Sequence, residues 1–244
     1  MKEIEYFTED NRNSYVSHQT GTMAKTFMSS VFSYMFLGVL LTGFTAWYLA
    51  YSGLLERYLI TEQGVSPLLY VAMFAPLGLV FWMSLGFNRM RASTMLILFI
   101  VYAFLNGVAF SSIFLTYNLG AIYKAFGSAG VLFGLMAVVG YTTKTDLTKL
   151  GNILYIALIA LIVTMLINFF VGSSGLDYLI SIIGVVIFTG LTAYDVQKLK
   201  EIGEGSVDIN NPSTRKFALY GALSLYLDFI NLFLFLLRLF GGRD

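Results

Sequence analysis

Seven apolar runs, each about as long as a bilayer is thick, occupy most of this chain. A hydrocarbon core of about 30 Å needs roughly 20 apolar residues when each residue of a helix rises 1.5 Å. Helices suit such a core because they pair their backbone N–H and C=O groups internally. The sequence therefore predicts an all-α polytopic membrane protein with spans near residues 27–50, 67–86, 94–117, 125–143, 153–171, 178–197 and 217–239.

The composition indicates a single membrane domain. Hydrophobic residues make up 57% of the 244 residues and charged residues 12%, whereas an ordinary soluble domain has roughly 25% charged residues. The connections between the runs are polar and mostly short, and the longest reads KLKEIGEGSVDINNPSTRK. We expect residues 1–26 to form a polar, flexible cytoplasmic tail with no signal peptide, and residues 27–244 to form a seven-helix transmembrane domain.

Charge and cysteine content exclude several classes of function. The formal net charge is +1 with no long block of one sign, so a nucleic-acid partner is not indicated. The chain has no cysteine and one histidine, His18, which removes the ligands of most zinc, haem and redox sites. We therefore expect no cofactor and no enzymatic activity.

Basic residues predict the orientation in the membrane. The N-terminal tail and the second, fourth and sixth connections carry 11 of the 15 lysines and arginines. Lysine and arginine accumulate on the cytoplasmic side, so we expect the N-terminus inside and, with seven spans, the C-terminus outside. If the last run were re-entrant instead, Arg238 and Arg243 would return to the cytoplasmic side.

Two acidic residues, Asp195 and Asp228, lie clearly inside the predicted spans. In the last span Ser224, Asp228 and Asn231 follow each other at i, i+4 and i+7, and in the sixth Thr192 shares a face with Asp195. Lipid offers no hydrogen bonds, so two such polar stripes should meet each other or a water path. Thr192, Ser224 and Asn231 are therefore candidates for lining a pore beside the aspartates.

Two carboxylates within hydrogen-bonding distance cannot easily ionise together, so the pair would titrate as a unit. Protonated, they could share a hydrogen bond; deprotonated, they would repel, admit water and offer transient oxygen ligands to Ca²⁺. The plainer alternative is that each aspartate makes a helix-packing hydrogen bond and nothing more. Asp228 lies about 16 Å along its helix from Phe217, whereas Asp195 lies near the cytoplasmic end of its own. A contact would require tilted helices, a deeper start of the last span, or a polar cavity.

Small residues at four-residue spacing predict close helix packing. They are Gly38, Thr42 and Ala46 in the first span, and Gly130 and Gly134 in the fourth. We expect them to pack within the molecule rather than to form a dimer interface.

Two long motifs, TGLTAYDVQKLK at 189–200 and GALSLYLDFINLFLFLLRLFG at 221–241, closely resemble the bacterial branch of the transmembrane Bax inhibitor motif family. GYTTKTDLTKLG at 140–151 and LNGVAFSSIF at 105–114 are similar to its fourth-span exit and third span. The resemblance runs from about residue 67 to the end. It implies a central last helix wrapped by the others, and a pH-sensitive Ca²⁺ leak of the bacterial inner membrane gated by Asp195 and Asp228. An arginine after the second span is similar to the family's latch for those carboxylates. Arg89 and Arg91 both fit this role. Each could equally be one of the basic residues that accumulate in cytoplasmic connections.

Two other functions compete with the leak. Relatives in the family include regulators of a membrane-bound protease and of cell death, so a membrane-protein partner is the main alternative. An intramembrane aspartyl protease would also need two aspartates, and Tyr194-Asp195 is similar to its first motif. Its second motif is missing, because Leu225, Tyr226 and Leu227 stand before Asp228 where such enzymes have glycine.

Overall fold

The computed structural model describes residues 2–55, 57, 60–61, 64–205 and 211–241, and the side chains of these residues except 2–21, 60–61 and 64–65. Its seven helices that are long and apolar enough to cross a membrane match the seven predicted spans. They are α1 (Lys2–Tyr51, with the apolar part Thr22–Tyr51), α2 (Pro67–Leu85), α3 (Ala92–Phe110) continued by α4 (Ile113–Thr116), α5 (Leu119–Thr142), α6 (Thr148–Val171), α7 (Ser174–Glu204) and α8 (Pro212–Phe240).

Three shorter elements join these helices. The two-residue strands β1 (Ile60–Thr61) and β2 (Gly64–Val65) pair antiparallel between α1 and α2, a small departure from an all-helical chain. The short 3₁₀ helix η2 (Phe87–Arg89) connects α2 to α3. The connections therefore contain no separate soluble domain in the part of the chain described.

Polar residues in the connections start the helices. The side chains of Ser66, Asn118, Ser173 and Asn211 each accept a hydrogen bond from a backbone N–H in the first turn of α2, α5, α7 and α8. Such caps satisfy donors that have no partner within the helix. Gly172 ends α6 with a φ of 67°, a conformation that favours glycine. The boundaries of the spans thus follow from local sequence.

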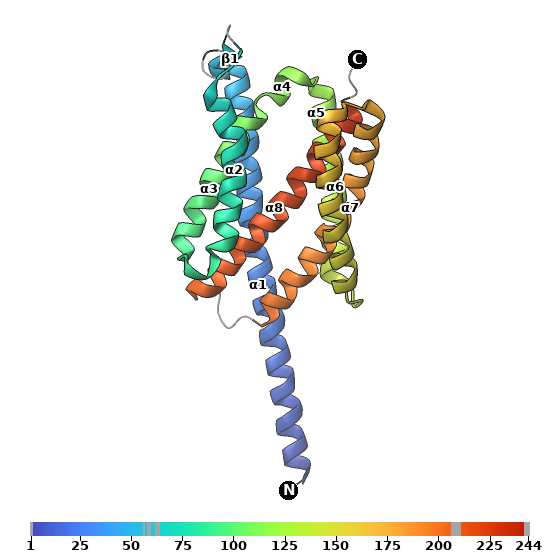
Figure 1. The fold of residues 1–244 in the computed structure, drawn as a ribbon. Coiled ribbons are helices and arrows are strands. Elements are labelled where there is room, and N and C mark those ends of the chain that lie inside the picture. Colours follow the sequence, from blue (N-terminus) through green and yellow to red (C-terminus); the bar gives the residue numbers. More distant parts are fainter. Residues whose placement is uncertain (1, 56, 58–59, 62–63, 206–210, 242–244) are drawn as a thin grey trace.

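The backbone of the N-terminal tail is helical. The backbone of α1 is helical from Lys2, and Figure 1 shows its first part extending beyond the bundle. The polar tail is therefore an extension of the first membrane helix. His18 belongs to the residues whose side chains are not described.

The last helix is central, as the resemblance implies. It packs against α1, α3, α5 and α7, and Figure 1 shows it crossing the bundle diagonally. In the apolar stretches of α7 and α8, 61% of the residues are buried inside the protein, against 11% in α6. Because α8 is one continuous helix of 29 residues, its run is not re-entrant.

The small residues of the first span pack within the molecule, as predicted. Thr42 and Ala46 are buried, and a Cβ added at Gly38 would lie 2.6 Å from the ring of Phe99. The Thr42 hydroxyl donates to the carbonyl oxygen of Ala103 at 2.8 Å. This stripe holds α1 against α3.

The small residues of the fourth span do not pack within the molecule, so that prediction is wrong. Gly130 and Gly134 are exposed, and no atom lies within 4 Å of the position that a Cβ would take at either. The buried face of α5 carries Ala125, Ala129 and Phe133 instead. Four-residue spacing identifies residues that share a helix face, and it does not tell whether that face points to lipid.

Candidate functional site

The candidate site lies along the seam between α7 and α8, which run antiparallel. Three contacts define their register: Gly184 with Phe235, Asp195 with Ser224, and Leu199 with Gly221. Continuing this register places Thr192 opposite Asp228 and Thr189 opposite Asn231. The two polar stripes that the sequence predicts to meet therefore belong to one seam.

Asp195 joins three helices. Its side chain is buried, and its Oδ1 accepts a hydrogen bond from the Tyr155 hydroxyl of α6 at 3.1 Å. Its Oδ2 accepts a hydrogen bond from the Ser224 hydroxyl of α8. Both oxygens of this carboxylate therefore have a hydroxyl partner. No sequence motif pointed to Tyr155, which is 40% exposed and lies on α6, where only 11% of the apolar stretch is buried.

Asp228 has a different environment at the same burial, since each aspartate is 5% exposed. Its Oδ2 receives no hydrogen bond from any N–H or hydroxyl group that the structure describes. The only other buried side-chain atom of the described residues in this condition is Thr189 Oγ1 on α7. Ser224, which donates to Asp195, precedes Asp228 by four residues, or about 6 Å along the helix.

The last helix is longer than a bilayer core and runs obliquely through the bundle. At 1.5 Å per residue, the 29 residues of α8 extend about 43 Å, longer than a hydrocarbon core of about 30 Å. Figure 1 shows α8 running obliquely past α7. The oblique course of α8 corresponds to one of the three routes that the sequence left open for a contact between the two stripes, namely helix tilt.

The other two pore-lining candidates lie on the seam without bonding to an aspartate. The Thr192 hydroxyl donates to the carbonyl oxygen of Phe188 at 2.7 Å, and Thr192 is fully buried. Asn231 is half-buried, and its amide donates to the carbonyl oxygen of Leu227 at 2.8 Å. Each side chain therefore bonds to its own helix.

An aromatic contact interrupts the polar seam on the side away from the tail. The rings of Phe188 and Phe235 stack with centroids 5.8 Å apart. A Cβ at Gly184 would lie 2.6 Å from Phe235, and the Arg238 guanidinium carbon lies 5.7 Å from the centroid of the same ring. The seam is thus closed by packed apolar groups between Asn231 and Arg238.

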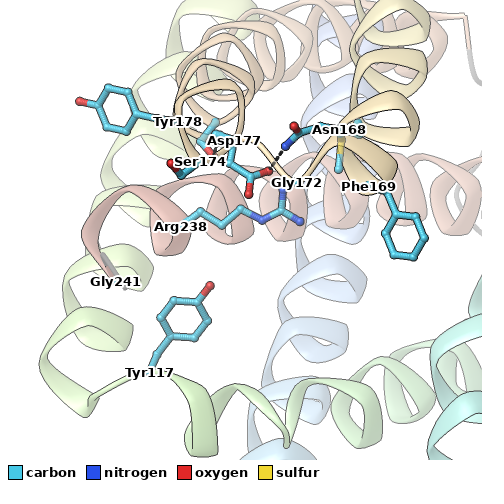
Figure 2. A pocket seen from close by; sticks show the side chains of 11 residues that line it. Tyr117, Asn168, Phe169, Gly172, Ser174, Asp177, Tyr178, Arg238 and Gly241 are labelled. Atoms are coloured by element: carbon cyan, nitrogen blue, oxygen red, sulfur yellow. Dashed lines mark hydrogen bonds between the residues drawn. The ribbon is translucent and has the colours of Figure 1, made fainter. Parts of the chain in front are cut away.

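Beyond this contact lies a pocket of about 670 Å³ between the ends of α6, α7 and α8. The buried Asn168 amide donates to Asp177 Oδ1 at 2.7 Å, and Figure 2 shows the Arg238 side chain extending below these two residues. Tyr117 and Ser181 also line the pocket. Sequence reasoning missed this site, although an asparagine in the apolar run of the fifth span was a usable signal.

The two latch candidates lie at the opposite end, in the turn between α2 and α3. Arg89 ends η2, Arg91 precedes α3, and both side chains are exposed. The one ion pair within 4 Å in the described part of the chain joins Lys200 and Glu204, so neither arginine pairs with an aspartate here. A latch would require another arrangement of the turn and stays a prediction.

Comparison with known proteins identifies the family, and the matched region includes α7 and α8, which carry the two aspartates. The family model described as "Inhibitor of apoptosis-promoting Bax1" matches residues 24–244. The chain belongs to the Bax inhibitor family. The match begins well before residue 67, so the family relationship extends to the first span.

Bacterial members of the Bax inhibitor family cover nearly the whole chain. Inner membrane protein YbhL of Escherichia coli K12 is 42% identical over 219 residues, which are 90% of this chain and 92% of that protein. An uncharacterized protein of Borreliella burgdorferi is 42% identical over 218 residues, 89% of this chain and 92% of its own. An uncharacterized membrane protein of Streptococcus pyogenes is 37% identical over 219 residues, with 89% and 93% covered. This protein is thus a bacterial-type membrane protein of the family.

Proposed function

We propose that this Bax inhibitor family protein is a pH-sensitive, calcium-permeable leak of the bacterial cytoplasmic membrane, gated by Asp195 and Asp228. In this proposal the N-terminus is cytoplasmic and the C-terminus lies outside, in accord with the distribution of basic residues. Protons control the gate and Ca²⁺ is the permeant ion.

The main observation that supports this proposal is the environment of Asp228. Its buried Oδ2 has no hydrogen-bond donor among the described groups, whereas Ser224, one helical turn away on α8, donates to Asp195, which also accepts from Tyr155. A negative charge in such a place needs either a proton or water, because burying an unpaired charge is costly. Packing of α7 against α8 without water between them is therefore favourable when Asp228 is protonated and unfavourable when it is charged.

Repulsion between the carboxylates determines whether the gate opens at high or at low pH. With protons bound, the helices pack as in the structure; with both carboxylates charged, they repel each other and water enters the seam. Carboxylate oxygens are the ligands that Ca²⁺ prefers, so Asp195 and Asp228 would hold the ion briefly as it passes. Flux should accordingly rise as pH rises and fall as pH falls.

In this proposal the ion follows the pocket of Asp177 and Arg238 and then the seam between α7 and α8. From the pocket of Asp177 and Arg238, the ion would pass the stacked rings of Phe188 and Phe235 and reach Asp228 and then Asp195. Hydrophobic constrictions can close a pore by excluding water. The aromatic pair would therefore have to separate when the carboxylates ionise.

The test is Ca²⁺ entry into liposomes that contain the purified protein, measured from about pH 5 to about pH 8. We expect the rate to rise with pH in the wild type and to be independent of pH in the double variant Asp195→Asn, Asp228→Asn. The control is Asp146→Asn in the exposed connection before α6. Hydrogen bonds from the Thr148 side chain and backbone N–H hold the pKa of Asp146 below its ordinary value, so this control removes a charge that is constant over the assay range. Absence of flux at every pH would overturn the leak.

The alternative function is regulation of another membrane protein, such as a membrane protease. The observation that favours it is α1, whose first part extends beyond the bundle (Figure 1). Deleting residues 2–21 separates the two functions. A leak should survive the deletion with its pH dependence, whereas a regulator that binds through this extension should lose its partner in a cross-linking assay in native membranes.

A further inference from the structure

A second cavity, of about 460 Å³, lies at the tail-side end of the bundle, where the turn between α2 and α3 meets the first turn of α8. Three basic side chains and two hydroxyl groups line it, and none of its described lining residues is acidic. These five residues are Arg91, Ser93, Ser213, Arg215 and Lys216. Residues more than 100 positions apart in sequence thus form one basic pocket.

The wall of the basic pocket is held together by Phe87 and Lys216. The Lys216 ammonium donates to the carbonyl oxygen of Phe87 at 2.9 Å and lies 4.5 Å from the centroid of its ring. The Phe87 ring also packs against Phe217 and Tyr220 of α8, with centroids 5.0 and 5.1 Å apart. The turn is therefore fixed on α8 by contacts within the protein.

The two guanidinium groups of the pocket remain available. Neither Arg91 nor Arg215 has a side-chain hydrogen bond or ion pair with another residue in the ranges that the structure describes. Guanidinium groups present paired N–H donors that match the oxygens of a phosphate, and serine hydroxyls add further donors. Like charges gathered without a counter-charge among the described lining residues favour an anion between them.

The surroundings indicate where that anion comes from. Leu85, immediately before the turn, is 86% exposed, and Phe217 and Tyr220 are 40% and 39% exposed. Apolar side chains on the outside of the bundle face lipid, so the pocket opens at the boundary between lipid and water. Basic pockets between membrane helices at this level suit anionic lipid headgroups. We propose that the basic pocket binds the phosphate of an anionic phospholipid headgroup, held by Arg91 and Arg215.

The phosphate site does not depend on the proposed leak. It does affect which arginine could act as the latch. A phosphate held between Arg91 and Arg215 would join the turn to the helix that carries Asp228, and it would keep Arg91 away from the aspartates. Arg89, which is not among the residues lining the pocket, would then be the remaining latch candidate.

The experiment measures lipid binding to the purified full-length protein in detergent. Native mass spectrometry counts bound phosphatidylglycerol and phosphatidylcholine, for wild type and for the double variant Arg91→Gln, Arg215→Gln. The matched control is Lys144→Gln, Lys149→Gln, which removes one charge from the connection before α6 and one from the first turn of α6. We expect phosphatidylglycerol to bind the wild type and the control, and to bind the arginine variant about thirtyfold more weakly.

A competition with inorganic phosphate distinguishes the two sources of the ligand. Retention of phosphatidylglycerol in preference to phosphatidylcholine, with loss only in the arginine variant, supports the lipid site. Thermal stabilisation of the wild type by inorganic phosphate, with no preference for the anionic lipid, keeps a phosphate site but overturns the lipid as its source. Equal phosphatidylglycerol binding by the arginine variant and the control overturns the proposal. A melting temperature near that of wild type shows that the arginine variant is folded.

Discussion

Asp195 and Asp228 are the same residue type, equally buried, on neighbouring helices, and yet their environments differ. Asp195 receives hydrogen bonds from Ser224 and Tyr155, so the protein itself can solvate a charge there. Asp228 Oδ2 has no such donor within the described chain, so a charge there depends on water. The two aspartates therefore do not differ in burial, and what separates them is the number of hydrogen-bond donors around each carboxylate.

The largest effect should appear in the pH profile of single variants. If Asp228 is the responsive group, Asp228→Asn should flatten the profile, whereas Asp195→Asn should keep part of it. We expect the wild-type rate of Ca²⁺ entry into liposomes to rise at least about tenfold between about pH 5 and pH 8, and the Asp228→Asn rate to change less than about twofold. A flat profile in Asp195→Asn with a normal profile in Asp228→Asn would reverse the two roles.

The two aspartates should also differ in the sign of a stability change. Asp228→Leu removes a buried polar group that lacks a donor, so we expect it to stabilise the protein by about 1–3 kcal/mol. Asp195→Leu would leave the hydroxyls of Ser224 and Tyr155 without their acceptor, so it should destabilise the protein by a similar amount. Unfolding in detergent at one fixed pH measures both. Equal effects of the two substitutions would contradict the comparison.

Removing one donor at a time should weaken the Asp195 site. Ser224→Ala and Tyr155→Phe each delete a hydroxyl that donates to this carboxylate, and we expect each to lower stability by about 1–2 kcal/mol. The control Tyr123→Phe changes a side chain that is 70% exposed and should have no measurable effect. Unchanged melting temperatures in both variants would show that Asp195 does not depend on these hydrogen bonds.

The smallest effect concerns the threonines of α7. Thr189→Val removes a buried hydroxyl that has no partner among the described groups, so we expect a change in stability between 0 and about +1 kcal/mol. Thr192→Val removes a hydroxyl that bonds to the carbonyl oxygen of Phe188, and it should be destabilising by about 0.5–1 kcal/mol. Thermal unfolding of the two variants side by side gives the comparison. A clear loss of stability in Thr189→Val would indicate a water or ion bound at that hydroxyl.

The sequence by itself determined the seven spans, the caps that begin several of them, and the polar stripes of α7 and α8. These features are local, because hydropathy, helical period and capping act over a few residues. The motifs around Asp195 and Asp228 also indicate the family, and the family match over residues 24–244 confirms it.

Only the tertiary structure decided which faces meet and at what angle. The tilt of α8 brings Ser224 to Asp195, and Tyr155 reaches the same carboxylate from a helix that is mostly exposed. Packing also turned Gly130 outward and brought Arg91 beside Arg215. Helical periodicity tells which side chains share a face, but the direction of that face and the crossing angle depend on the fit of whole helices against one another.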